Sequence, residues 1–249
     1  STWRRSNGVI RMKRYLFDMD GTLTASKKNI DKKFGEELLS FFFLEGECSI
    51  VTGSNYRNCQ DQLGQDILDA AEFLFCCNGS DVYYHSEWVE SNYWKPKENL
   101  KEFLRTCLIE SKFPAHLRTA NHLETRIGML NFSIVGQGAT DKVRKQYKTW
   151  DDCFYERKKI AQKINENFKT LVASVAGETG IDISSKKHTK AQVLDWYNRP
   201  EEILFFGDKT EEGGNDHPLA QKVETITVKS WRDTRKKLIK INKDILDYE

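Results

Sequence analysis

Tyr15-Leu16-Phe17-Asp18-Met19-Asp20-Gly21-Thr22-Leu23-Thr24 is the stretch of this 249-residue chain that decides the fold. An apolar run that ends in Asp-x-Asp-Gly predicts a buried strand stopping at a polar turn. In open α/β sheets, ligands bind outside the carboxyl ends of the strands. Two carboxylates one residue apart repel each other unless a cation lies between them, and oxygen ligands suit Mg²⁺. Asp and Gly are also common turn residues, so the acid pair alone equally fits an ordinary turn.

The composition is that of a soluble globular protein, with 39% hydrophobic residues, 31% charged residues and a formal net charge of +2. Lys-rich runs are interrupted by acids, which indicates solvated helix faces and no nucleic-acid partner. No window of about 18 apolar residues is present, so no membrane span is predicted. The six cysteines lack the spacing of a metal site, and we expect reduced thiols in a cytoplasmic protein.

Two patterns of apolar and polar residues follow one another along the chain. Short apolar strands are expected at residues 15–17, 48–51 and 73–76, with helices over residues 31–42 and 55–63 between them, which predicts a doubly wound parallel sheet. From about residue 85 to 187 the pattern is less regular, with helices expected at 100–108 and 156–168 and alternating strands at 130–135 and 171–175. That mixture is typical of an α+β unit. Apolar strands return at 202–206 and 225–228, followed by a helix over 235–246.

The predicted fold is therefore α/β, with a discontinuous core of residues 12–84 and 188–249 and an inserted α+β unit of residues 85–187. Residues 1–11 carry Arg4 and Arg5 but no apolar stretch of a secretory signal. We expect this segment to be a leader or a cloning remnant, with Met12 a plausible natural start.

Four polar clusters follow predicted strands or lie near the return to the core. They are the Asp18–Asp20 pair, the hydroxyls of Thr52 and Ser54, Lys190, and Asp208. A lone Ser or Lys is usually a surface residue, and an Asp after a strand is often a turn residue. Taken in order, an acid pair, hydroxyls, a cation and a further acid are the groups that phosphoryl transfer needs.

Asp18-Met19-Asp20-Gly21-Thr22-Leu23-Thr24 resembles the first motif of the haloacid-dehalogenase (HAD) phosphotransferases. Gly207-Asp208-Lys209-Thr210-Glu211-Glu212-Gly213-Gly214-Asn215-Asp216-His217 resembles the fourth motif of the eukaryotic-type phosphomannomutases within that superfamily. Thr125-Arg126-Ile127-Gly128-Met129-Leu130-Asn131 is similar to the motif of their inserted cap domain. The order and spacing of these motifs hold from Met12 over nearly the whole chain.

The resemblance implies a HAD-like core with an inserted cap and a role for each core residue. Asp18 is the nucleophile that becomes an aspartyl-phosphate, and Asp20 is the general acid/base. Mg²⁺ is held by Asp18, Asp208 and the backbone carbonyl of Asp20. The reacting phosphate is held by a further set, namely Gly21, Thr52, Ser54 and Lys190.

For the cap the resemblance implies a grip on a hexose phosphate. The substrate-binding residues that it implies are Lys27, Arg126, Asn131, Arg144 and Asp182. The implied activity interconverts mannose 6-phosphate and mannose 1-phosphate, with a catalytic hexose 1,6-bisphosphate as activator. The family also pairs through its caps, which makes a homodimer an expected partner.

Three positions depart from the family pattern. Gln137 replaces a third cap arginine, Gly180 replaces a serine that contacts phosphate, and His122 falls where the family has a phenylalanine associated with cap-to-cap pairing. Losing a charge-assisted hydrogen bond weakens a phosphate grip by about 1.5–3 kcal/mol. Two alternatives are therefore kept: a Mg²⁺-dependent sugar-phosphate phosphatase, and a non-catalytic sugar-phosphate binder, which the intact acid pair disfavours.

Overall fold

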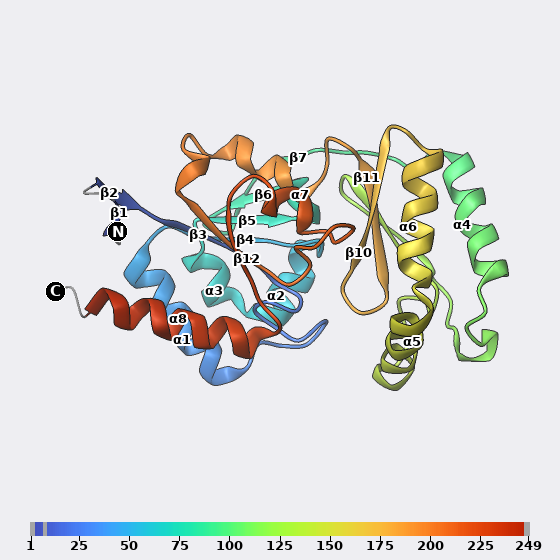
Figure 1. Ribbon diagram of the computed structural model, residues 1–249, viewed down its shortest axis with the longest axis horizontal. Coiled ribbons are helices and arrows are strands. Elements are labelled where there is room, and N and C mark those ends of the chain that lie inside the picture. The colour runs from blue at the N-terminus through green and yellow to red at the C-terminus, as the bar shows by residue number, and fades with distance from the viewer. Residues whose placement is uncertain (1–2, 7–8, 247–249) are drawn as a thin grey trace.

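A seven-stranded sheet is the frame of the first unit (Figure 1). The computed structural model describes residues 3–6 and 9–246, and the strand order of this sheet is β13-β12-β3-β4-β5-β6-β7. Its strands are β3 (Arg14–Asp18), β4 (Cys48–Val51), β5 (Phe73–Cys76), β6 (Asp81–Tyr84), β7 (Glu87–Ser91), β12 (Ile203–Gly207) and β13 (Glu224–Thr227). The first five in the spatial order are parallel, and β6 and β7 are antiparallel.

The strand order places the topological switch point between β3 and β12. The chain runs from β3 outward to β4 and β5, and after the insertion it returns to β12 on the other side of β3. Ligands of open α/β sheets bind at such a switch point, outside the carboxyl ends of the strands. The ends of β3 and β12 are therefore where a site is expected.

Helix α1 (Lys32–Glu45) shows why the sequence folds as it does locally. The Asp31 carboxylate accepts a hydrogen bond from Phe34 N at 3.0 Å and caps the helix. Phe34, Leu38 and Phe41 follow at helical spacing and are at most 2% exposed. Gly46 ends the helix in the left-handed conformation.

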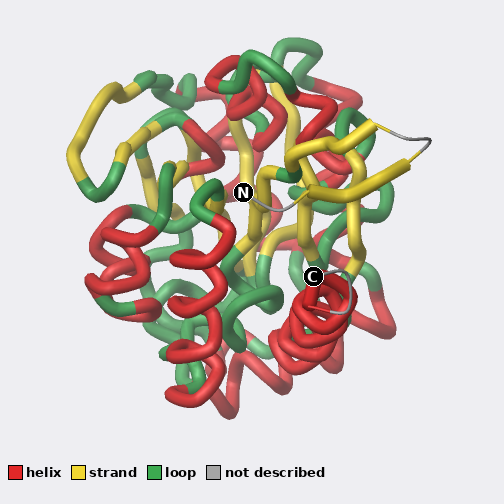
Figure 2. The backbone as a smooth tube through the Cα atoms, turned by 90° about the vertical axis from the view of Figure 1, so that its left-hand side faces the viewer, coloured by secondary structure: helices red, strands yellow, loops and turns green. Residues whose placement is uncertain are grey.

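Two apolar layers cover the two faces of this sheet. Tyr15 and Phe17 pack with the buried sides of α1, α2 (Tyr56–Leu63), α3 (Gln65–Ala70) and α8 (Trp231–Leu246). The intervening Leu16 points to the opposite face, against the segments η3 (Lys190–Trp196) and α7 (His217–Ala220). Helical segments accordingly lie on both sides of the strands (Figure 2). Successive side chains of a strand point to opposite faces, so a strand that is covered on both faces buries all of them.

The inserted unit is built on a four-stranded antiparallel sheet of order β10-β11-β9-β8. The strands are β8 (Leu123–Arg126), β9 (Met129–Ser133), β10 (Leu171–Ala176) and β11 (Gly180–Ser185), and the helices are α4 (Glu98–Glu110), α5 (Asp141–Phe154) and α6 (Glu156–Asn167). Strands β10 and β11 lie between the first unit and these helices (Figure 1). The sheet face away from the helices therefore looks toward the switch point.

The doubly wound parallel sheet and the inserted α+β unit are confirmed. The sequence analysis missed the hairpin of β6 and β7, strands β8 and β11, and helices α3, α5 and α7. The predicted boundary at residues 84 and 85 falls inside that hairpin, and β7 belongs to the first sheet. Within the predicted leader, β1 (Trp3–Ser6) pairs with β2 (Val9–Met12). The described helices include none with the length and apolarity needed to cross a bilayer.

Candidate functional site

The turn after β3 folds tightly back on itself. The carbonyl oxygen of Met19 accepts hydrogen bonds from three following backbone amides, those of Thr22, Leu23 and Thr24. Gly21 has φ +93°, and a Cβ atom there would lie 2.3 Å from Oδ2 of Asp208. Only glycine meets both demands, since the backbone is left-handed and the carboxylate approaches so closely. The glycine therefore lets the acids at the ends of β3 and β12 come together.

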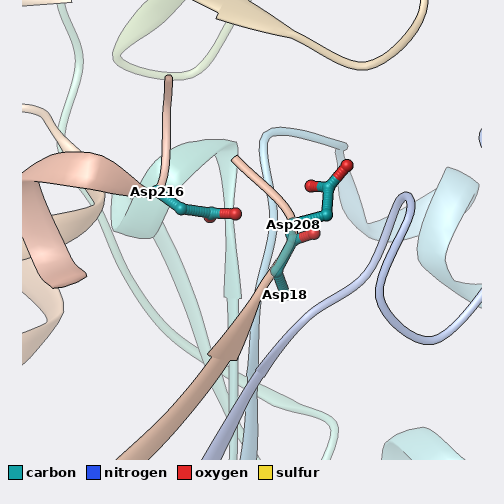
Figure 3. Close-up of side chains that lie close together, drawn as sticks. All are labelled: Asp18, Asp208 and Asp216. Atoms are coloured by element: carbon teal, nitrogen blue, oxygen red, sulfur yellow. The ribbon is translucent and has the colours of Figure 1, made fainter. Parts of the chain in front are cut away.

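Three carboxylates meet at these strand ends. One oxygen each of Asp18, Asp208 and Asp216 lies within 4.8 Å of the others, and Figure 3 shows the three side chains close together. Asp18 ends β3, Asp208 follows β12, and Asp216 is held by the backbone amide of Lys209 at 3.0 Å. Oxygen ligands at this spacing suit a hard divalent cation.

Lys190 partly neutralises this cluster. Its Nζ donates to Oδ1 of Asp18 at 2.5 Å and to Oδ1 of Asp216 at 2.7 Å, and its side chain is fully buried. The pKa of Lys190 is raised because the charges of Asp18 and Asp216 outweigh its burial. The ammonium of Lys209 lies 3.6 Å from Oδ2 of Asp208, so two ammonium groups face three carboxylates and the centre keeps negative charge.

Together with burial, the excess negative charge contributes to the raised pKa values of Asp18 and Asp208. Burial, followed by the charge of Asp216, raises the pKa of Asp18 well above its usual value, and Lys190 only opposes this. Burial raises the pKa of Asp208 to about 6. Oδ2 of Asp18 is buried and has no hydrogen-bond partner among the described residues. A divalent cation fits this donor set, because it would neutralise the surplus charge.

The predicted metal set and this cluster differ in one side chain. The carboxylate of Asp20 lies outside the three-acid cluster, accepting from the backbone amide of Lys27 at 2.7 Å and from Ser54 Oγ at 3.4 Å. Asp216 was not singled out from the sequence, although it lies in the quoted fourth motif. Its neighbours Asn215 and His217 are polar too, so the sequence alone offered no way to choose among them.

The hydroxyl turn after β4 faces the same place. Thr52 and Ser54 are buried, and the Ser54 amide donates to Thr52 Oγ1 at 3.1 Å. The side chain of Asn55 then accepts from the backbone amide of Asn58 and caps α2, which begins directly after this turn. The predicted phosphate-binding hydroxyls are thus beside Asp20.

The inserted unit contributes cations that reach across to the first unit. Arg126 donates from Nη1 to the Gly53 carbonyl at 2.6 Å and from Nη2 to Glu124 at 2.7 Å. Arg144 donates to Thr179 Oγ1 at 3.2 Å, and its other amino group lies 3.4 Å from Ser26 Oγ. Both guanidinium groups are at most 9% exposed. Arg144 is also paired with Glu178 at 3.3 Å, so each of the two arginines in the space between the units has one acidic partner.

A cavity of about 60 Å³ between the units gathers the predicted residues. Ten of them line it: Asp18, Asp20, Asp208, Thr52, Ser54, Lys27, Arg126, Asn131, Arg144 and Asp182. Lys190 and Gly21 do not line it. They lie directly against the acid cluster, where Lys190 bonds Asp18 and Gly21 makes room for Asp208.

The positions that depart from the family pattern also have defined places. Gln137 and Gly180 line the cavity. A Cβ atom at Gly180 would lie 2.7 Å from Nδ2 of Asn131, which donates to Asp182 at 2.8 Å. A larger residue at this position would displace Asn131. His122 lies outside the cavity, with Nδ1 2.9 Å from the Ser133 carbonyl.

The architecture and the acid-lined switch point define a haloacid-dehalogenase-like protein with an inserted cap. An IMP-nucleotidase of Plasmodium falciparum shares this fold, with a TM-score of 0.63, 14% identity and coverage of 93% of this chain and 68% of that one. A haloacid dehalogenase-like hydrolase from Bacteroides thetaiotaomicron has a TM-score of 0.56, with 15% identity and coverage of 93% and 100%.

Sequence comparison narrows the class. The protein-family model described as eukaryotic phosphomannomutase matches residues 24–244 of this chain. A phosphomannomutase of Dendrobium officinale is 31% identical over 232 residues, which cover 88% of this chain and 90% of the relative. The chain belongs to the eukaryotic phosphomannomutase family, and the family resemblance of its motifs is confirmed.

Proposed function

We propose that this chain is a phosphomannomutase, an isomerase that interconverts mannose 6-phosphate and mannose 1-phosphate through an aspartyl-phosphate and a hexose bisphosphate. One observation carries the proposal. Asp18, whose Oδ2 has no hydrogen-bond partner among the described residues, lines the same cavity between the two units as Arg126 and Arg144 of the cap. Such a cavity can hold a sugar with one phosphate at the nucleophile and a second at the cap.

At the acid end, Asp18 is the nucleophile, since its Oδ2 is unpaired while Oδ1 is held by Lys190. Asp20 is the general acid/base, placed by the Lys27 amide and Ser54. The reacting phosphate is bound by the turn and strand-end groups predicted for it, namely Gly21, Thr52, Ser54 and Lys190.

Mg²⁺ is the cation that we propose for the acid cluster, held by Asp18, Asp208 and the backbone carbonyl of Asp20, with Asp216 beside them. When bound, it would shield Asp18 from the anionic phosphate and polarise the phosphoryl oxygens. With or without the metal ion, Lys190 fixes the orientation of Asp18 and Asp216 through its hydrogen bonds to both.

At the cap end, we propose that Arg126, Arg144 and Lys27 bind the phosphate that is not reacting. Guanidinium groups match phosphate oxygens bidentately. Asn131 and Asp182 are joined by a hydrogen bond of 2.8 Å and line the space between the phosphates, where they would bind sugar hydroxyls. Liquid water occupies about 30 Å³ per molecule, so the observed cavity is smaller than a hexose and the cap must open for substrate.

A sugar-phosphate phosphatase is the second candidate, favoured by the lost cation at Gln137 and the lost hydroxyl at Gly180. A weaker grip at the cap would release the bisphosphate or admit water to the aspartyl-phosphate. A catalytic hexose 1,6-bisphosphate as activator, a homodimer through the cap and a cytoplasmic location complete the proposal.

Phosphorus NMR separates the candidates. The protein is incubated with mannose 1-phosphate, Mg²⁺ and a catalytic amount of hexose 1,6-bisphosphate. Accumulation of mannose 6-phosphate supports the mutase, and accumulation of inorganic phosphate supports the phosphatase instead. An unchanged spectrum would contradict both and leave a sugar-phosphate binder.

A further inference from the structure

Two hollows lie next to each other between the units. The inner one is the cavity of about 60 Å³ described above, and the outer one has about 670 Å³. Sites for small molecules usually measure about 300–1,000 Å³, so only the outer hollow has room for a phosphorylated hexose in this conformation. The two share four lining residues: Lys27, Ser54, Arg126 and Gln137.

The shared residues form the wall between the hollows, and hydrogen bonds between the units close it. Lys27, on the segment after the Asp20 turn, donates from Nζ to Oε1 of Gln137 at 3.1 Å. Arg126 donates to the carbonyl of Gly53 at 2.6 Å. Each bond joins one unit to the other, so opening the wall requires breaking bonds between the units.

Gln137 suits this place because an amide both accepts and donates. Its oxygen accepts from Lys27, while its Nε2 donates to Oδ1 of Asn131 at 2.7 Å. Asn131 in turn donates to Asp182, which also lies 3.4 Å from Nδ2 of Asn78 in the first unit. An arginine, which has no acceptor, could not make the bond to Lys27. The wall is thus continuous with the sugar-binding end of the cavity.

An arriving phosphate can open this wall. Lys27 bonds the neutral amide of Gln137, whereas a phosphate oxygen carries negative charge, so the ammonium is attracted more strongly to a phosphate than to the amide. Burial, followed by the positive charges of Arg144 and Arg126, lowers the pKa of Lys27, so an anion beside it relieves repulsion among the three cations. The anion therefore competes well against Gln137 for the lysine.

The outer hollow has the chemistry of a sugar site. Amide side chains suit hydroxyl groups, since each both donates and accepts. Asn29, Asn58, Gln62 and Asn121 line it. Lys27 and Arg126 supply the positive charge at its inner wall, and only Leu123 is apolar. The acids Asp61 and Glu124 also line it, and Glu124 is paired with Arg126 at 2.7 Å.

We propose that the outer hollow is a second binding site for phosphorylated hexoses, where a substrate enters and the bisphosphate turns around, and that the Lys27–Gln137 hydrogen bond is the gate between the two hollows. The turning role rests on the proposed mutase function. Because the bisphosphate must present its other phosphate to Asp18, a site of this size lets it turn without leaving the protein.

Filling the outer hollow tests the site. Thr125 is exposed and lines the outer hollow but not the inner cavity. Thr125→Trp should slow the conversion of mannose 1-phosphate by about tenfold or more, as overpacking does. It should slow the phosphorylation of Asp18 by acetyl phosphate much less, since this small donor needs no turning. Thr106→Trp, on the exposed side of α4, is the matched control and should leave both rates unchanged.

Equal rates for Thr125→Trp and Thr106→Trp with mannose 1-phosphate would overturn the outer site, as would an equal loss with both donors. The wild-type protein tests the mutase function separately. If it only hydrolyses mannose 1-phosphate, the mutase function fails, while the ratio between the two donors in Thr125→Trp still decides whether substrate passes through the hollow.

The gate has its own variant. Gln137→Met keeps the length of the side chain but cannot accept from Lys27. It should admit water and hydrolyse the aspartyl-phosphate formed from acetyl phosphate faster than wild type, by about tenfold for a gate bond of ordinary strength. An unchanged rate of hydrolysis would show that the Lys27–Gln137 bond does not control access.

Discussion

Replacing Lys190 by methionine should expose how much the acid cluster depends on one buried cation. The ammonium is fully buried and bonds Asp18 and Asp216, which are at most 6% exposed. Methionine has a similar length but no charge. Removing one partner of a buried ion pair is strongly destabilising, typically by about 3–5 kcal/mol, because the remaining charges stay buried without compensation.

Protonation of Asp18 sets an independent upper bound on the stability that Lys190→Met loses. In the variant, Asp18 can escape the repulsion by binding a proton, since the only group that lowers its pKa by contact is gone. For a carboxyl with an unfolded pKa of about 3.9, taking up that proton costs about 5 kcal/mol at pH 7.5. The two values agree, and together they predict a fall in Tm of about 6–20 °C for a chain of this length.

The sign of the pH dependence follows from the same proton. A carboxyl whose folded pKa is raised contributes stability at low pH and loses it as the pH rises from the unfolded toward the folded pKa. The folded variant therefore binds more protons than the unfolded chain, and its free energy of unfolding should fall by about 1.4 kcal/mol per pH unit through neutrality. Its deficit relative to wild type should shrink toward pH 5.

Thermal and urea unfolding, with a chelator present and at pH values from 5 to about 8 where proteins are usually most stable, measure both effects. Lys148→Met is the control, since Lys148 and Asp152 form an exposed pair on α5 that is worth about 0–1 kcal/mol. If Lys190→Met unfolds like Lys148→Met, or its deficit does not depend on pH, the reasoning on the buried charges is wrong.

Asp18→Asn should abolish turnover while leaving the thermal transition intact, and residual activity above roughly a thousandth of wild type would count against covalent catalysis. Mg²⁺ at about 100 times its Kd should stabilise the wild-type protein by about 2.7 kcal/mol. Asp208→Asn should lose most of this gain and Asp20→Asn should keep it, and the reverse order would show that the Asp20 side chain is the ligand. Because burial and the nearby arginines lower the pKa of Lys27, KM for mannose 1-phosphate should rise at alkaline pH earlier than an ordinary lysine would cause. Lys27→Arg should remove that rise, and an identical profile in the two proteins would exclude Lys27 as its source.

The core of the fold was predictable because its signals are local. Residues 15–17, 73–76 and 203–206 are uninterrupted apolar runs, and residues 48–51 are interrupted only by Ser49, as is typical of strands buried on both faces. Asp31 and Gly64 mark helix ends through their own side-chain and backbone chemistry, and the structure has them at those ends. Helical segments cover both faces of these strands, so each strand is a run of apolar residues whichever helices cover it. The run can therefore be recognised from the sequence alone.

The inserted unit was harder to predict because its elements are amphipathic and charged. Helix α5 reads Asp-Lys-Val-Arg-Lys-Gln-Tyr-Lys-Thr-Trp, and few apolar residues mark its buried side. Strand β7 is exposed along its length at the edge of the first sheet, so it lacks the apolar run that identified its neighbours. Asp216 was missed for another reason, since only the folded loop shows that its carboxylate turns back to Asp18.

The loop that carries the acid cluster also touches the cap. Between Asp208 and Asp216 the chain makes a turn whose Gly213 carbonyl accepts from the backbone amide of Val175 in β10 at 2.9 Å. Gly213 is left-handed, and at Gly214 a Cβ atom would lie 2.2 Å from the Lys209 carbonyl, so this close turn requires glycine at both positions. A displacement of β10 on opening must therefore either break this bond or move a turn that ends in two of the three acids. The acid cluster and the cap are thus joined through this backbone hydrogen bond and the turn that carries it. If Asp18 is the nucleophile that we propose, that link would couple the assembly of its site to closure of the cap and exclusion of water.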